Sequence, residues 1–333
     1  MTHFAILWHR IAWSRRAALG AVLLGMLSLV GIFAEFIAGP APIIWTGPRG
    51  VEVLGSVVHA DELDASSDEI RFARYETGTG IWPLVRYGPT HPSDAGPSAA
   101  PSSRHPLGTD MKGRDLTARL VYGARTALGL SLAAVLTGMF LGVLLGGFAG
   151  TYRGFWNDRL VRLVETVDTF PAIIMVALIR AIEREPSALS LVLAAAVVRW
   201  AEIARLVRAE VLRASAEDYV LAAKALGCSD LRVFFRHILP NALGPVIVSS
   251  VFGVTSVVLL ETAISFLPMG APAQAASWGE TLAQAALHPE NLRLLLWPGA
   301  LLLLTIGGSY LLADALRDAV DPRTVRTREE RRG

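Results

Sequence analysis

Few residues of this chain have the type and spacing that catalysis requires. Only two lysines occur, Lys112 and Lys224, and neither follows a glycine-rich phosphate-binding loop. The seven histidines are scattered, and the sequence has no H-E-x-x-H or paired-cysteine pattern for a metal ion. The single cysteine, Cys228, can form no intrachain disulfide. We therefore expect no catalytic site, no metal site and no cofactor on this chain.

The more informative polar residues lie inside long apolar runs. Arg199 and Glu202 are three residues apart, so they can pair on one face of a helix. Glu261 and Ser265 lie four residues apart in another run. Ionisable residues within a membrane helix are candidates for a transport pathway. Arg199, Glu261 and Ser265 are therefore predicted to line a pathway or to hydrogen-bond neighbouring helices, and the sequence leaves both roles open.

Membrane-spanning helices must position these residues. The 333 residues are 53% hydrophobic and only 18% charged, and runs of about 20 apolar residues can cross the hydrocarbon core of a bilayer. The net charge of +2 gives no indication of nucleic acid as a partner. We predict an all-α integral membrane protein with six transmembrane helices, at about residues 17–38, 122–149, 161–182, 187–206, 243–267 and 292–313.

The distribution of basic residues predicts the orientation of these helices. The connections after the second, fourth and sixth helices are rich in arginine, whereas residues 268–291 contain no lysine or arginine. Because positively charged loops stay in the cytoplasm, both termini and the connection after the fourth helix are expected there. Residues 1–38 then comprise the N-terminus and a retained first helix, because its apolar run is longer than that of a signal peptide.

Residues 39–106 are predicted to form an extracytoplasmic segment between the first two helices. Val51–Leu54 is strand-like, and a short helix can open near Ser67. Residues 88–106 are rich in Pro, Ser and Gly, which is typical of an extended linker. The core transmembrane domain is expected over 107–318, followed by a basic tail over 319–333.

A stripe of glycines marks the second predicted helix. Gly138, Gly142, Gly146 and Gly150 recur every four residues and so lie on one helix face. Such a face lets another helix approach closely. The pattern predicts tight helix packing, and it does not decide whether the two helices also shear against each other.

The connection after the fourth helix, residues 214–241, has the pattern of two short helices. Ser215 and Asp218 are predicted to form a capping box at the start of the first one. Gly227 is predicted to end it, since glycine adopts the left-handed conformation that terminates helices. Pro240 is expected in the first turn of the following membrane helix.

The same connection carries a family pattern. Its residues YVLAAKALG and, after a gap, RHILPN resemble the cytoplasmic coupling loop (the EAA loop) of ABC-importer permeases. Leu221 stands where that family usually has Glu, a departure that is common in the dipeptide/oligopeptide subfamily. The two alanines, Ala222 and Ala223, would offer a small surface on which an ATPase rests. The resemblance implies that the contacts with the ATPase involve Asp218, Tyr219, Ala222, Ala223, Gly227, His237, Leu239, Pro240 and Asn241.

Further stretches resemble the same subfamily. Residues 107–125, LGTDMKGRDLTARLVYGAR, are similar to its signature LGTD-x-x-GRD followed by YGAR. Residues 261–272 and 314–323 resemble its C-terminal stretches, with Pro268 in place of the usual Gly. The long extracytoplasmic segment is similar to that of the extended oligopeptide or microcin-type permeases.

The resemblance implies a type I ABC importer permease in the bacterial inner membrane. Its partners would be a homologous second permease, two ABC ATPase subunits that hydrolyse ATP, and a periplasmic or lipid-anchored substrate-binding protein. Peptides are the expected solutes, and nickel or another small solute of the same subfamily is the alternative. A secondary transporter, the alternative from another class, would be expected to have internal repeats, and none is evident.

Overall fold

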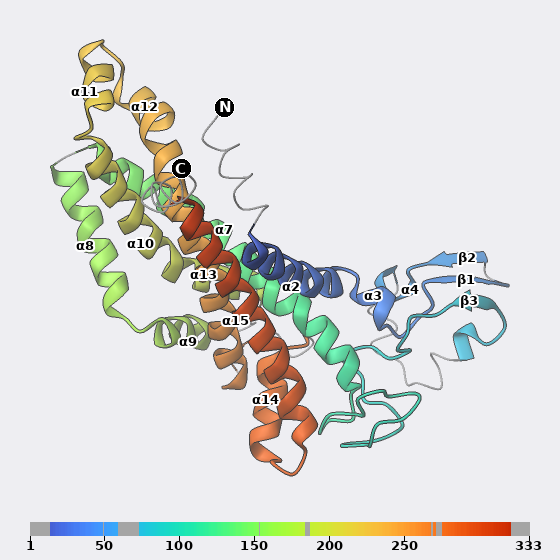
Figure 1. Cartoon of the computed structure of the whole chain (residues 1–333). Coiled ribbons are helices and arrows are strands. Elements are labelled where there is room, and N and C mark those ends of the chain that lie inside the picture. Colours follow the sequence, from blue (N-terminus) through green and yellow to red (C-terminus); the bar gives the residue numbers. More distant parts are fainter. Residues whose placement is uncertain are drawn as a thin grey trace.

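Long helices dominate the structure, which is a computed structural model describing residues 14–48, 50–58, 73–152, 154–183, 187–267, 269–270 and 275–320. Four helices in these ranges are long and apolar enough to cross a membrane: α2 (Arg15–Ile32), α7 (Leu116–Thr151), the continuous helix Asp230–Phe266 and α15 (Leu292–Val320). They pack together as one elongated bundle (Figure 1). These four helices correspond to the first, second, fifth and sixth predicted spans.

The third predicted span is two helices rather than one. α8 (Phe155–Thr169) and α9 (Ala172–Ile182) are separated at Pro171, and Phe170 before it has an extended backbone with φ −86° and ψ 130°. A proline disfavours the helical conformation in the residue that precedes it, so α8 ends there. The prediction of a single helix over 161–182 is therefore wrong.

The fourth predicted span is part of a longer helix, α10 (Ala188–Ala214). Its start is capped by Ser187, whose side chain accepts a hydrogen bond from the backbone N–H of Ser190 at 3.1 Å. Both α8 and α10 carry several charged side chains, and α9 is a shorter apolar helix. The total of six spans therefore stays a prediction.

A small sheet lies between α2 and α7 in the sequence, beside the bundle (Figure 1). β1 (Ile44–Gly47) pairs with β2 (Gly50–Val53) and β3 (Thr79–Ile81) in the antiparallel order β2-β1-β3. Trp45 on the central strand is buried, and its indole N–H donates to the carbonyl of Tyr75 at 3.3 Å. One face of the sheet thus packs on its own small aromatic core.

Short helices flank this sheet. α3 (Ala34–Ile37) continues from α2, and α4 (Gly55–Val58) follows β2. The strand predicted at Val51–Leu54 corresponds to β2, whereas the helix expected near Ser67 lies outside the described residues.

The Pro-, Ser- and Gly-rich stretch 88–106 is not an extended linker. Ser93 and His105 are buried, and the backbone N–H of Ser98 donates to the carbonyl of Asp110 at 2.9 Å. The hydroxyl of Thr109 likewise donates to a carbonyl of this stretch at 2.7 Å. These hydrogen bonds fold the stretch back onto the turn that precedes α7, which corrects the prediction of a free linker.

A helix that was not expected, α14 (Trp278–Leu287), packs between α13 and α15 and against α7. Trp278 is fully buried, and its indole N–H donates to the carbonyl of Leu120 at 3.0 Å. The indole fills the space left by Gly123, where a Cβ atom would lie 2.6 Å from the ring. The helix is too short for a membrane span, so a search for long apolar runs does not find it.

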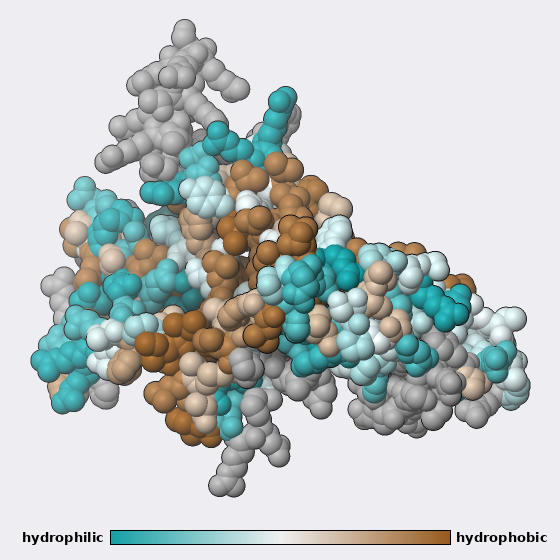
Figure 2. Space-filling model, turned by 90° about the horizontal axis from the view of Figure 1, so that it is seen from below, coloured by the Kyte–Doolittle hydropathy of each residue, from teal (hydrophilic) through white to brown (hydrophobic). Residues whose placement is uncertain are grey.

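Hydrophobic side chains gather over the helices in the middle of the molecule, while hydrophilic ones cover much of the segment between α2 and α7 (Figure 2). These hydrophobic side chains include exposed leucines and phenylalanines of α7, such as Phe140, which is 63% exposed. Arg16 at the start of α2 and Asp314 near the end of α15 form an exposed ion pair at 3.4 Å, which joins the two helices.

Candidate functional site

The connection after α10 projects beyond the helical bundle (Figure 1). It contains α11 (Asp218–Ala225) and α12 (Asp230–Val233), followed by a π-helical turn, η1 (Phe234–Ile238). This turn leads without a break into α13 (Leu239–Phe266). The loop is therefore a direct extension of two long helices, α10 and α13.

A hydrophobic core holds the loop rigid. Val220 and Ala223 of α11 pack with Val211 at the end of α10 and with Val233 and Phe234 of the second helical segment, and all five are buried. Burial of apolar side chains of this size contributes about 1–3 kcal/mol each. The loop is therefore packed firmly onto the ends of α10 and α13.

Pro240 accounts for the π-helical turn. A proline has no backbone N–H to bond the carbonyl four residues earlier, and its ring clashes with that carbonyl. Here the N–H of Leu239 donates instead to the carbonyl of Phe234, five residues earlier. The widened turn accommodates Pro240 while the helix continues, so α12 and α13 stay in line.

Three predicted contact residues meet at the base of the loop. The side-chain amide of Asn241 donates to the hydroxyl of Tyr219 at 3.2 Å and to the carbonyl of His237 at 3.0 Å. The rings of Tyr219 and His237 have centroids 6.5 Å apart. This cluster ties the start of α11 to the start of α13, and Leu239 beside it packs partly buried against the loop core.

The loop also exposes several large apolar side chains along its helices. We call this set the loop apolar patch: Tyr219, Leu221, Leu226, Leu231 and Phe235, each at least 43% exposed and Leu226 86% exposed. Ala222 is also exposed. Ala223, by contrast, is 9% exposed and faces the loop core, so the expectation that Ala223 offers surface to a partner is wrong.

The caps of the loop helices differ in part from the prediction. Ser215 ends α10, and its hydroxyl donates to the carbonyl of Val211 at 2.7 Å. The N-cap of α11 is Glu217, so Ser215 and Asp218 form no capping box there. Gly227 has φ +82°, the left-handed conformation that ends α11.

The glycine stripe lies where α7 contacts α10. A Cβ atom on Gly138 would lie 2.7 Å from Cβ of Arg199, and one on Gly146 would lie 2.3 Å from the carbonyl oxygen of Ala204. Gly142 and Gly150 are as close to side chains of α10. Only glycine permits this separation of the two backbones.

The polar residues predicted in the membrane lie in two separate places. Arg199 is buried and donates to Glu202, as the spacing predicted. Glu261 is 2% exposed, and its Oε1 accepts hydrogen bonds from Ser265 at 2.7 Å and Ser277 at 2.9 Å. The second group joins α13 to the start of α14, which favours helix–helix hydrogen bonding over contact with a solute for Glu261 and Ser265.

Known proteins resemble this chain over most of its length. Residues 142–326 match the family described as binding-protein-dependent transport system inner membrane component. The dipeptide transport system permease protein DppC of Alkalihalophilus pseudofirmus is 37% identical over 239 residues, which cover 71% of this chain and 77% of that protein. This chain belongs to the family of binding-protein-dependent transport system inner membrane components. The oligopeptide permease OppC of Bacillus subtilis is 33% identical over 67% of this chain and 73% of its own, and the glutathione permease GsiD of Pectobacterium atrosepticum is 34% identical over 67% and 74%.

Membership confirms the prediction of an α-helical, multi-pass permease of the inner membrane. It also confirms the resemblance that the coupling-loop pattern suggested, because that pattern lies within the matched residues. The permease is thus the membrane component of a binding-protein-dependent transport system.

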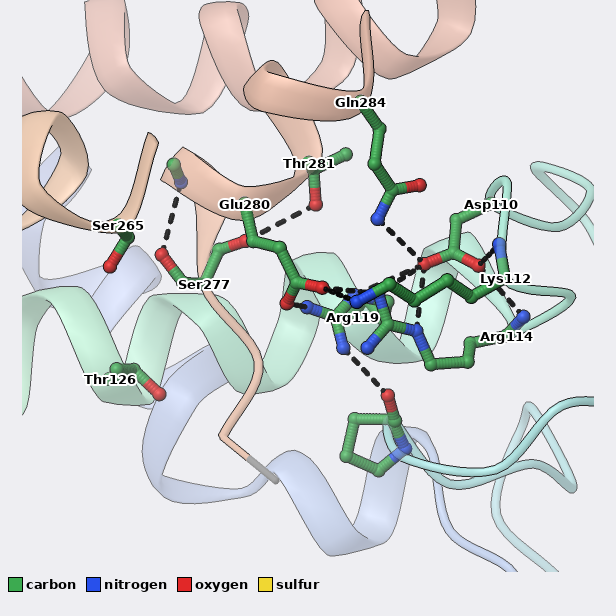
Figure 3. A network of polar contacts seen from close by, with 12 residues as sticks. Asp110, Lys112, Arg114, Arg119, Thr126, Ser265, Ser277, Glu280, Thr281 and Gln284 are labelled. Atoms are coloured by element: carbon green, nitrogen blue, oxygen red, sulfur yellow. Dashed lines mark hydrogen bonds and ion pairs between the residues drawn. The ribbon is translucent and has the colours of Figure 1, made fainter. Parts of the chain in front are cut away.

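A charged cluster that the sequence analysis did not identify joins the start of α7 to α14 (Figure 3). Asp110 accepts hydrogen bonds from Arg114 Nε at 2.8 Å and Gln284 Nε2 at 3.2 Å. Glu280 accepts from Arg114 Nη2 and Lys112 Nζ, both at 2.8 Å. Asp110, Lys112 and Arg114 belong to the LGTDMKGRD stretch. That motif was evident in the sequence, but its partner Glu280 was not, because α14 was not expected.

Glu280 is strongly stabilised as a carboxylate by this cluster. Burial opposes its ionisation, but the charge of Arg119 and the hydrogen bonds from Lys112 and Arg114 outweigh burial and lower the pKa of Glu280 from 4.5 to about 2. The folded state therefore gains stability from this group above its unfolded pKa, and that stability is lost as the pH falls from about 4.5 towards 2.

Arg180 is a further buried arginine that the sequence did not single out. Arg180, at the end of α9, is 4% exposed and donates to the carbonyl of Met269 at 3.1 Å, to Glu183 at 2.9 Å and to Ser190 Oγ at 2.7 Å. It connects α9, the start of α10 and the segment that follows α13. A single arginine in an apolar run gives little indication of such a set of partners.

We predict that Gly146→Ala destabilises the permease, since the added Cβ meets the α10 backbone. The melting temperature in detergent or nanodiscs should fall by roughly 2–10 °C, the effect of overpacking a tight contact. Gly129→Ala in the same helix is the matched control, because no atom lies within 4 Å of its Cβ position. An equal response of both variants would contradict the packing role.

We also predict a pH-dependent effect of Glu280→Gln. The wild-type permease should melt several degrees above this variant at neutral pH, and the difference should disappear as the pH falls from about 4.5 towards 2. Thermal unfolding in nanodiscs at a series of pH values measures it. Glu76→Gln, an exposed carboxylate in the segment between α2 and α7, should give no such difference, and a constant gap in melting temperature for Glu280→Gln at all pH values would contradict this role of Glu280.

Proposed function

We propose that the permease forms one half of a peptide import pathway, with a homologous second permease as the other half. Relatives named as dipeptide, oligopeptide and glutathione transport permeases support peptides as the solute class. A periplasmic or lipid-anchored binding protein delivers the peptide, and two ABC ATPase subunits supply the energy. The chain itself hydrolyses nothing.

The loop apolar patch is the observation that carries the ATPase contact. Tyr219, Leu221, Leu226, Leu231 and Phe235 expose apolar side chains in the connection of α11, α12 and η1, which projects beyond the bundle (Figure 1). Large apolar side chains exposed on a loop outside the membrane helices mark a candidate protein interaction site. Residues 214–241 are therefore the coupling loop, and a groove on the ATPase covers the patch.

Rigid connections transmit the motion of the ATPase into the membrane. The loop core fixes α11 to the ends of α10 and α13, and the glycine stripe fixes α10 to α7. When the ATPases close on ATP, displacement of the loop therefore moves α10, α13 and α7 together. The pathway opens outward in that state, and ATP hydrolysis returns it to the inward-facing state.

The proposed topology follows from the position of this loop. With the loop in the cytoplasm, α14 and residues 39–106 lie on the extracytoplasmic side, and both termini lie in the cytoplasm. The arginine-rich connections support this orientation. The functional divisions are residues 1–38, the extracytoplasmic segment 39–106, the core 107–318 and the basic tail 319–333.

The variant Leu226→Asp tests the proposed function. A carboxylate within the loop apolar patch should be hydrated on the free permease. It would lose this hydration against the ATPase, which is unfavourable because a buried unpaired charge is costly. We expect loss of ATPase co-purification and at least a tenfold loss of peptide uptake in proteoliposomes that contain the complete system.

Leu287→Asp is the matched control. Leu287 is likewise an exposed leucine at the C-terminal end of a short helix, 78% exposed, but it lies on α14 at the other end of the molecule. It should leave ATPase association unchanged. Normal ATPase association and normal uptake by Leu226→Asp would contradict the docking assignment.

The variant Ala223→Glu is unsuitable for this purpose, because Ala223 lies in the loop core and the change would unfold the loop.

A further inference from the structure

Glu202 is an exposed carboxylate in the part of α10 that is predicted to cross the membrane. Its side chain is 47% exposed in this subunit. It is the fifteenth residue after the N-cap Ser187, so it lies about 22 Å along the helix at 1.5 Å per residue. That distance is shorter than the hydrocarbon thickness of about 30 Å. The carboxylate is therefore inside the span predicted over 187–206.

A buried arginine and a half-buried serine hold this carboxylate in place. Arg199, whose side chain is 7% exposed, donates through Nη1 to Glu202 and through Nη2 to the carbonyl of Ser249 at 3.2 Å. The hydroxyl of Ser249 donates to Glu202 Oε1 at 3.0 Å. Gly253 makes room for the guanidinium, since a Cβ atom there would lie 2.5 Å from Nη2. The positive charge lies behind the carboxylate, so the surface presents the negative one.

Lipid is an unsuitable environment for this surface. Charged groups in membrane helices face a water-filled cavity, a partner protein or the bundle interior because exposure to hydrocarbon is unfavourable. The exposed side of α7 at a similar depth has Leu136, Phe140 and Leu144, which suit lipid. The side of the molecule formed by α10 and α13 at Glu202 is therefore turned away from lipid.

We propose that Glu202 lines the translocation pathway and binds the positively charged ammonium group of the solute in transit. Arg199 and Ser249 are positioning residues that fix the carboxylate. Because Arg199 already compensates part of its charge, Glu202 holds a passing ammonium group weakly enough to release it, as conduction through a pathway requires. This inference rests on the proposed import function, and it assigns a solute contact to one named side chain.

The first test measures whether Glu202 faces water. Glu202→Cys is introduced into a Cys228→Ser background, in the complete transporter without nucleotide, and its reaction with the charged thiol reagent 2-sulfonatoethyl methanethiosulfonate is followed. Leu136→Cys on α7, which is 50% exposed, is the control that faces lipid. We expect the thiol at position 202 to react at least about tenfold faster, because the reagent needs water to reach it. An equally slow reaction at both positions would overturn the proposal.

The second test measures recognition of the charge. In proteoliposomes that contain all subunits and a saturating binding protein, uptake of dialanine should fall about tenfold for Glu202→Gln and much less for Glu202→Asp. Glu165→Gln, an exposed carboxylate on α8, should keep wild-type uptake. Normal uptake by Glu202→Gln overturns the inference alone, whereas failure of the wild-type system to import any peptide overturns the proposed function.

Discussion

The close contact between α7 and α10 is the constraint on which the rest of the permease depends. Four glycines, at 138, 142, 146 and 150, bring the two backbones together along most of the length of the contact. α10 continues into the loop, and the loop continues into α13. The direction of the projecting loop is therefore set by a helix contact within the membrane, and side chains larger than hydrogen at these positions would change it.

Several buried or half-buried ionisable side chains in the described part of the permease are each held by more than one partner. Arg180 joins three segments near the end of α9, Arg114 and Glu280 join the start of α7 to α14, and Glu261 joins α13 to Ser277. Breaking a buried pair by removing one partner is far more costly than the net stability of the pair. These contacts therefore specify which segments meet, more than they add to stability. Glu202 differs, because its buried partner leaves the carboxylate itself exposed.

The sequence predicted the features that depend on local spacing. The long apolar helices, the glycine face of α7, the pairing of Arg199 with Glu202 and the helix-ending role of Gly227 all follow from intervals of three or four residues or from backbone preference. Features that depend on distant partners were not predictable. Glu280 meets Arg114 across more than 160 residues of chain, and α14 is too short to be recognised by its hydropathy. One prediction from local spacing was also wrong. The hydroxyl of Ser215 donates to the carbonyl of Val211 at the end of α10, so it does not cap α11.

In the proposed function, the loop apolar patch, on an extension of α10 and α13, receives the force of ATP hydrolysis. The most direct measurement is a photo-crosslink from position 226, with benzoylphenylalanine in place of Leu226, in the complete transporter reconstituted in nanodiscs. The account predicts a crosslink to the ATPase subunit. A crosslink only to lipid or to the second permease, with none to the ATPase, would contradict it.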